Sequence, residues 1–137
     1  MTPRAQSRTT PCTRQQADQR LRQAEGFLRW AEVALADKAA TVNLDVAASL
    51  AVLAGIAAGD APCGKVLGHY SRGQRHDGAA NLIQSVQPGG PHLESKFRQL
   101  VAYKDDAQYA PKTMGASSAK AAVRQAAELV AAAKSHP

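Results

Sequence analysis

The segment from Val46 to Gly59 restricts the possible folds of this chain more than any other, because Ser49 is its only hydrophilic residue. Its larger side chains recur with a period close to 3.6 residues: Val46, Leu50, Leu53 and Ala57. A helix that is apolar nearly all round is a buried, central one. We therefore expect a central helix that begins after Thr41 or Asn43, with the other elements packed around it.

The composition agrees with a fold built from helices. Aromatic residues make up only 4% of the 137 residues and hydrophobic residues 45%, so Ala, Leu and Val must fill the core. Small side chains let helices approach closely, and no strand pattern competes anywhere. A chain of this length forms one domain that buries about two-thirds of its unfolded surface. The prediction is an all-α, single domain over residues 13–137.

Four further helices are expected around the central one, which gives a bundle-like domain of about five helices. Pro62 should kink or end the central helix, although Cys63, Val66 and Leu67 continue its apolar pattern. The remaining helices are predicted at 13–39, 79–86 and 91–110, and from Ser117 or Ser118 to about 135.

Residues 1–12 are predicted to form a disordered, basic arm. The formal net charge is +6, and five arginines of the first 22 residues face only one acidic residue, Asp18. Such an arm can neutralise phosphates. It can equally be a solvated tail, because Thr, Pro, Ser and Gln surround the arginines. The arginines concerned are Arg4, Arg8, Arg14, Arg20 and Arg22.

The sequence lacks the residue patterns of disulfide-rich, metal-binding, secreted and membrane-spanning proteins. Cys12 and Cys63 make neither a disulfide framework nor a zinc set, and the four histidines include no Glu-x-x-His, so we expect no metal and no cofactor. No apolar leader follows the N-terminus, and Val46–Gly59 is too short to span a bilayer. The expectation is a cytoplasmic protein with reduced thiols and no membrane partner.

A polar loop at 68–78 carries the first group of candidate binding residues. Tyr70, Arg72, Arg75 and His76 supply a ring, two cations and a titratable group within seven residues. That chemistry suits a phosphate or a stacked base. A solvated turn would use the same residue types, so both interpretations stay open.

The end of the predicted 91–110 helix carries the second group. Asp105 and Tyr109 lie four residues apart on one helical face, so the carboxylate could accept the tyrosine hydroxyl hydrogen bond. Lys104 continues the apolar face, so its stem should pack inward while its ammonium seeks an acceptor. The three residues would form a polar cluster at the end of a core helix.

Over about residues 15–135 the chain resembles the HEPN superfamily, small α-helical domains named for nucleotide binding in higher eukaryotes and prokaryotes. The long helix rich in small residues and the Ala-rich last helix fit this superfamily. The stretch Leu100–Pro111 is similar to its Leu-x-x-x-Arg-Asn/Asp-x-Ala-Asp-Tyr signature. Val52–Ala58 with Lys104–Tyr109 resembles an Ala-rich actinobacterial branch. The resemblance implies a homodimer formed through helix faces, and roles in toxin–antitoxin pairs, phage defence or RNA processing.

Ribonuclease members of that superfamily use an Arg-x4–6-His motif, in which Arg holds the phosphate and His moves a proton. No arginine here has a histidine at that spacing, since only three residues separate Arg72 from His76. At the end of the 91–110 helix, Lys104 and Tyr109 stand where Arg and His would. Lys lacks the bidentate fork, and a tyrosine with a pKa of about 10 is a poor proton acceptor at pH 7.

The sequence therefore favours no catalytic residue and a non-catalytic binding and dimerisation module. Its partner would be a protein encoded by a neighbouring gene, a nucleotide or RNA. One alternative is an atypical metal-independent ribonuclease that pairs Arg72 with His76, or Lys104 with Tyr109. Another is a basic nucleic-acid-binding protein. The candidate binding residues are Tyr70, Arg72, Arg75, His76, Lys104, Asp105 and Tyr109.

Overall fold

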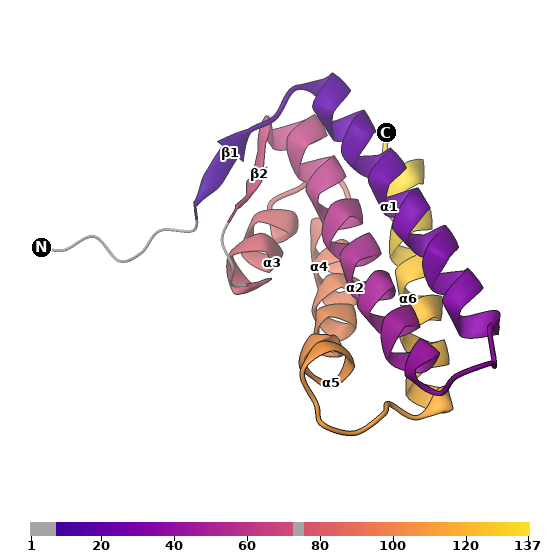
Figure 1. Ribbon diagram of the computed structural model, residues 1–137. Helices are drawn as coiled ribbons and strands as arrows, with labels where there is room; N and C mark the ends of the chain where they lie inside the picture. Colours follow the sequence, from indigo (N-terminus) through magenta and orange to yellow (C-terminus); the bar gives the residue numbers. More distant parts are fainter. Residues whose placement is uncertain (1–7, 73–75) are drawn as a thin grey trace, which may run out of the picture.

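The computed structural model describes residues 8–72 and 76–137 (Figure 1). Apart from one pair of three-residue strands, all regular elements within these residues are helical, which confirms the all-α prediction. In chain order they are β1 (Thr9–Pro11), α1 (Arg14–Ala36), α2 (Val42–Pro62), the π-helical η1 (Cys63–Leu67), β2 (His69–Ser71), α3 (His76–Gln84), α4 (Gly90–Val101), α5 (Lys104–Gln108) and α6 (Ala116–Ser135).

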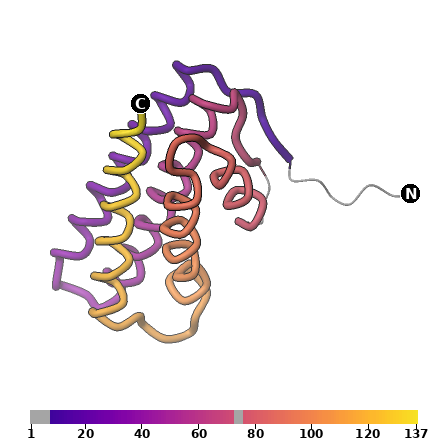
Figure 2. The backbone as a smooth tube through the Cα atoms, turned by 180° about the vertical axis from the view of Figure 1, so that it is seen from behind, coloured from indigo at the N-terminus to yellow at the C-terminus, as the bar shows by residue number. Residues whose placement is uncertain are grey.

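Helix α2 lies at the centre of the domain, as its apolar sequence predicted. α1 runs back alongside α2, and α4 and α6 lie behind these helices in Figure 1 and in front of them in the reversed view of Figure 2, with α6 in contact with both α1 and α2. α3 packs against α4, and α5 contacts the end of the bundle at which α2 begins. One stripe of α2 is left uncovered by the other helices.

Close helix packing depends on residues of α2 that have no bulky side chain. A Cβ atom at Gly59 would lie 2.8 Å from Cδ1 of Ile83 and 3.1 Å from the Phe97 ring. A Cβ atom at Gly55 would overlap the Leu100 side chain. Glycine at these two positions lets α3 and α4 approach the α2 backbone, and buried alanines continue the same smooth surface along the helix.

Pro62 does not end the central helix. Since proline disrupts the α-helical hydrogen-bond ladder, the chain widens there into η1 and continues to Leu67, so the apolar continuation predicted from the sequence is present. Gly68, in the left-handed conformation with φ 79°, closes the helix. At the same end of the bundle, a capping box between Thr13 and Gln16 starts α1.

The predicted 91–110 helix is divided. A turn at Ala102 and Tyr103 separates α4 from α5. α6 starts at Ala116 with Gly115 as its cap, although a serine cap at Ser117 or Ser118 was expected. These differences shift boundaries by a few residues and leave the order of helices as predicted.

The strand pair corrects the prediction that no strand is present and that residues 1–12 are all disordered. β1 pairs with β2 in antiparallel register, with Thr10 opposite Tyr70. At its two ends the amide of Cys12 donates to the carbonyl of Gly68 at 2.8 Å, and the amide of Arg72 donates to the carbonyl of Arg8 at 2.7 Å. The rest of the predicted arm, residues 1–7, lies outside the described residues.

Candidate functional site

The fold brings together candidates that the sequence placed in two separate groups. His76 is the first residue of α3, and Lys104 and Asp105 are the first residues of α5. Burial lowers the pKa of His76, the Lys104 ammonium lowers it further, and the carboxylates of Asp105 and Asp77 raise it. Lys104 and Asp105 therefore lie within electrostatic range of the His76 imidazole.

The environment of His76 is suited to a neutral, proton-accepting ring. The imidazole packs edge-on against Phe97, with ring centroids 6.2 Å apart. Its Nε2 atom is buried and has no hydrogen-bond partner among the described residues. An uncharged imidazole near an ammonium can accept a proton next to a bound anion.

Tyr109 does not join this group. It caps α5 and its side chain is 69% exposed. Its backbone amide donates to the carbonyl of Asp105 at 2.9 Å, whereas the expected hydroxyl–carboxylate hydrogen bond is absent from the described contacts. Backbone hydrogen bonds, not the predicted side-chain pair, therefore end this helix.

The candidate residues of the 68–78 loop do not form one group either. Tyr70 lies on β2 and lines a recess of about 210 Å³ against α1, together with Thr10, Pro11, Gln16, Gln19, Arg20 and Gln23. Arg72 follows the same strand and is exposed. Arg75 lies outside the described residues. Tyr70 and His76, six residues apart in sequence, thus face different helices.

A buried ion pair is the main polar feature that sequence reasoning missed. Arg20 Nε donates to Asp60 Oδ2 at 2.8 Å, and Asp60 is only 6% exposed. Burial raises the pKa of Asp60 to about 6, against the hydrogen bond and charge of Arg20, which lower it. An acidic residue at the end of an otherwise apolar segment was the available signal, since a buried charge needs a partner.

Both cysteine thiols lie near the Arg20–Asp60 ion pair, and their buried surroundings disfavour the reactive thiolate form. Burial, then the Asp60 and Cys12 charges, raise the pKa of Cys63 to about 12. Burial and Asp60 raise the pKa of Cys12 as well. Thiolates are the reactive species, so two buried thiols with raised pKa values behave as packing groups.

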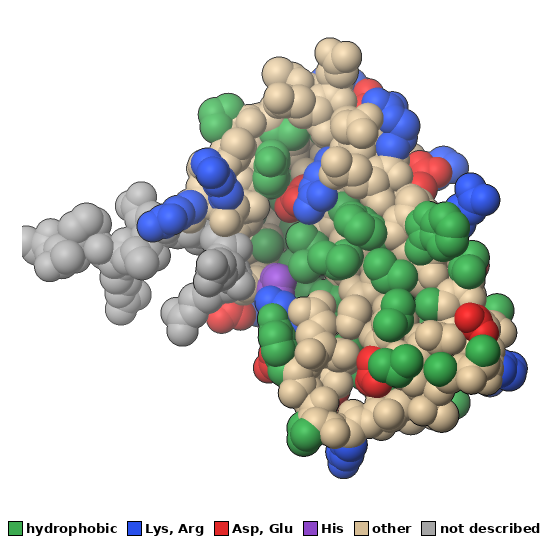
Figure 3. Space-filling view, in the orientation of Figure 1, with side chains coloured by type: hydrophobic (Ala, Val, Ile, Leu, Met, Phe, Trp, Pro, Cys, Tyr) green, Lys and Arg blue, Asp and Glu red, His purple; other side chains and the backbone are tan. Residues whose placement is uncertain are grey.

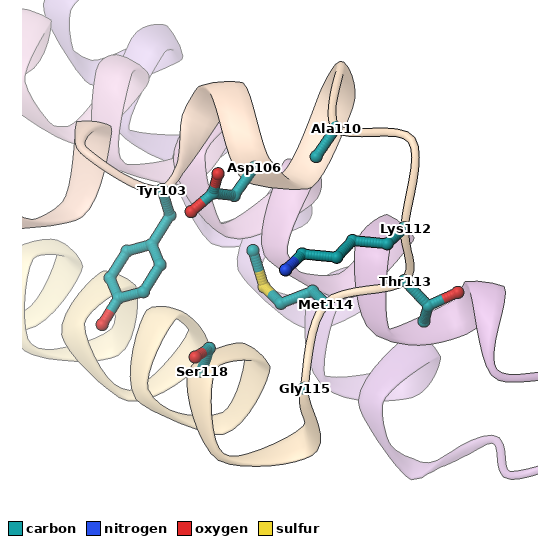
Figure 4. A pocket seen from close by; sticks show the side chains of 8 residues that line it. All are labelled: Tyr103, Asp106, Ala110, Lys112, Thr113, Met114, Gly115 and Ser118. Carbon is teal, nitrogen blue, oxygen red and sulfur yellow. The ribbon is translucent and has the colours of Figure 1, made fainter.

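A second recess, of about 390 Å³, lies between α5, the segment after it and the start of α6 (Figure 4). The Lys112 side chain runs back towards Met114, and Asp106 and Tyr103 lie on the opposite wall. None of the sequence candidates lines this recess. In the described part of the chain, no three His, Cys, Asp or Glu side chains form a group that could hold a metal ion.

Apolar side chains gather on the surface that α1 and α2 share (Figure 3). Trp30 and Val33 on α1, and Val42, Val46 and Leu53 on α2, are all more than a third exposed. The continuous helix Val42–Leu67 is long and apolar enough to cross a membrane by length and composition, which corrects the estimate made from Val46–Gly59. Half of its most apolar part is buried in the domain.

Searches against protein families, curated proteins and solved structures found no match to this chain.

Proposed function

We propose that this chain is a non-catalytic, HEPN-like cytoplasmic module that forms a homodimer and acts by binding. The observation that carries the proposal is the exposed apolar surface of α1 and α2. Monomeric soluble proteins rarely expose contiguous apolar patches larger than roughly a few hundred Å², and patches above that size mark interaction sites. Trp30, 58% exposed, adds the residue type most often found at the centre of interfaces.

The spacing along α2 supports a second copy as the occupant. Val42, Val46, Ser49 and Leu53 follow one another at intervals of four, three and four residues, the spacing of a helix–helix seam. A two-fold axis would lay this stripe against itself, as in the isologous interfaces of most homodimers. The resemblance to HEPN domains, which dimerise through helix faces, supports the same arrangement. The dimer would present its polar surfaces to a partner protein of a defence or toxin–antitoxin-like system, a nucleotide or RNA.

Leu53→Glu tests this proposal. We expect the wild-type chain to sediment as a dimer and Leu53→Glu as a monomer with unchanged helical circular dichroism, because the substitution places a charge in the seam without disturbing the buried side of α2. Val66→Glu, an exposed apolar residue of η1, is the matched control and should remain dimeric. A wild-type chain that is monomeric at high micromolar concentration would contradict the proposal.

One observation favours a second candidate function, a metal-independent ribonuclease. The imidazole of His76 and the ammonium of Lys104 come from separate segments, yet the ammonium is close enough to add to the effect of burial in lowering the pKa of His76. A neutral His76 could accept the proton of a ribose 2′-hydroxyl while Lys104 holds the phosphate as a point charge. This pair would take the roles of the Arg and His of the superfamily motif, in place of the two pairings expected from the sequence.

Cleavage of labelled single-stranded and transfer RNA in the presence of EDTA tests the second candidate. If it is correct, His76→Gln should lower the rate by about 100-fold or more, the usual share of a general base, and Lys104→Gln should do likewise. Tyr109→Phe, on the exposed end of α5, should cleave like the wild type. No cleavage by the wild-type protein would remove this candidate and leave the non-catalytic proposal.

A further inference from the structure

Three glutamine side chains line the recess between α1 and the strand pair, and each has its amide oxygen engaged in a hydrogen bond within the protein. Gln16, Gln19 and Gln23 lie on one face of α1 and line the recess. The backbone amide of Thr13 donates to Gln16 Oε1 at 2.9 Å, and the guanidinium of Arg22 donates to Gln19 Oε1 at 2.8 Å. Arg20 donates in the same way to Gln23 Oε1 at 2.8 Å.

These partners fix which end of each amide remains for a ligand. Backbone N–H and guanidinium groups can only donate, so each must face an amide oxygen and cannot face an NH2 group. All three oxygens are therefore engaged within the protein. The three NH2 groups have no hydrogen bond to another described residue and remain as donors. The recess is complementary to a molecule rich in hydrogen-bond acceptors.

The remaining lining adds a flat apolar surface and a hydroxyl. The ring of Tyr70 is partly buried and lies opposite Thr10 across the strand pair. The Thr10 Oγ1 atom is buried and has no partner among the described residues. At about 210 Å³ the recess is smaller than the roughly 300–1,000 Å³ typical of sites for drug-sized ligands. It suits one small ring.

The same face of the strand pair carries two cations. Side chains alternate between the faces of a strand, so Arg8 lies on the face of Thr10 and Arg72 on the face of Tyr70. The hydrogen bond from Arg72 N to Arg8 O continues the register and places the two arginines opposite each other. Like charges at directly opposite positions destabilise a strand pair, and an anion bound between the two guanidinium groups would offset that repulsion. Each arginine is two residues away from a residue that lines the recess, Arg8 from Thr10 and Arg72 from Tyr70, which is about 7 Å along the strand.

We infer that this face binds a nucleotide unit whose base carries carbonyl acceptors, with uracil in the recess and its phosphate between Arg8 and Arg72. Uracil and thymine present a carbonyl where adenine and cytosine present an amino donor, and an amino group would meet the glutamine NH2 groups donor to donor. Guanine has acceptors as well but is the larger ring. Stacking on Tyr70 would hold the flat face of the base. This inference rests on the binding function proposed above and specifies its ligand.

Fluorescence polarisation with labelled eight-nucleotide RNAs tests the inference on the full chain. We expect oligouridylate to bind about tenfold more tightly than oligoadenylate, the effect of about one hydrogen bond gained or lost. Competition by UMP separates the two sources of this chemistry. Displacement by UMP at concentrations near the Kd of the oligomer indicates a free nucleotide, and displacement only far above it indicates a strand.

Gln16→Glu is the most informative variant. A carboxylate keeps the acceptor that completes the capping box with Thr13, and an acid in the first turn of α1 suits the helix. The variant should therefore fold as stably as the wild type, yet it replaces an NH2 donor by an acceptor and should weaken oligouridylate binding about tenfold or more. Gln99→Glu, which adds the same charge on the exposed face of α4, is the matched control and should change the Kd less than twofold.

Two further results complete the test. Tyr70→Leu should weaken oligouridylate and oligoadenylate alike, and Arg72→Gln should lower the slope of log Kd against log salt concentration by about one. Equal affinity for the two RNAs, or a Gln16→Glu variant that binds like Gln99→Glu, would overturn the inference. A protein that is monomeric but passes these tests would refute the proposed dimer and leave the nucleotide site standing.

Discussion

Phe97→Ala is expected to lower the free energy of unfolding by about 3–5 kcal/mol, the cost usual for truncating a fully buried phenylalanine. Phe97 has no exposed surface and is the largest of the fully buried side chains. Its ring fills the space between α4 and α2, where a Cβ at Gly59 would lie only 3.1 Å away. No flexible side chain of α2 stands at that point to fill the cavity, so the lost contacts would not be recovered.

Urea denaturation of the two proteins measures this effect. Phe97→Leu is the graded control and should cost less, because it keeps most of the apolar volume. A loss below about 1 kcal/mol for Phe97→Ala would mean that the helices collapse onto the site. The same variant should raise the pKa of His76 followed by NMR, since the ring of Phe97 contributes to the burial that lowers it.

The helices could be predicted because their signal is local. The period of Val46–Gly59, the capping residue Thr13 and the proline-rich break before α4 each depend on residues a few positions apart. The division between α4 and α5 could not be predicted, because Ala102 and Tyr103 are ordinary helical residues. Both helices pack against α2, and such tertiary contacts leave no local signal in the sequence.

The strand pair had no local signal at all. Each strand has three residues, too few to show alternation, and they pair across some sixty residues of chain. Their hydrogen bonds are satisfied only once α2 and η1 have brought Gly68 to Cys12. The recess beside Tyr70 depends on this pairing, so the sequence singled out Tyr70 without its glutamine partners on α1.

The candidate residues near His76 show the same limit. The sequence placed His76 and Lys104 in two separate groups and offered Arg72 and Tyr109 as their respective partners. Their approach depends on how α3 and α5 pack around the bundle, which no spacing along the chain encodes. Residue types could be predicted from the chemistry they offer, but their grouping is a property of the tertiary fold.

Asp60→Asn is expected to remove a loss of about 3 kcal/mol in the free energy of unfolding, which the wild-type protein undergoes between pH 4 and pH 7. This is the free energy that corresponds to a rise of the Asp60 pKa from 3.8 to about 6. Because the folded state holds this proton more tightly than the unfolded state, Asp60 favours folding below about pH 4. That contribution is lost as the pH rises through about 6, where the buried carboxylate ionises.

Asparagine cannot ionise, and its Oδ1 atom can still accept the hydrogen bond from Arg20 Nε. The stability of Asp60→Asn minus that of the wild type should therefore rise by about 3 kcal/mol between pH 4 and pH 7. Denaturant unfolding at several pH values measures the difference, and Asp18→Asn, on the exposed side of α1, controls for the loss of one negative charge. A difference that stays constant with pH would show that Asp60 ionises as easily in the fold as outside it. A difference that falls towards pH 7 would show that attraction to Arg20 exceeds the cost of burying the charge, and that the ion pair holds α1 against α2.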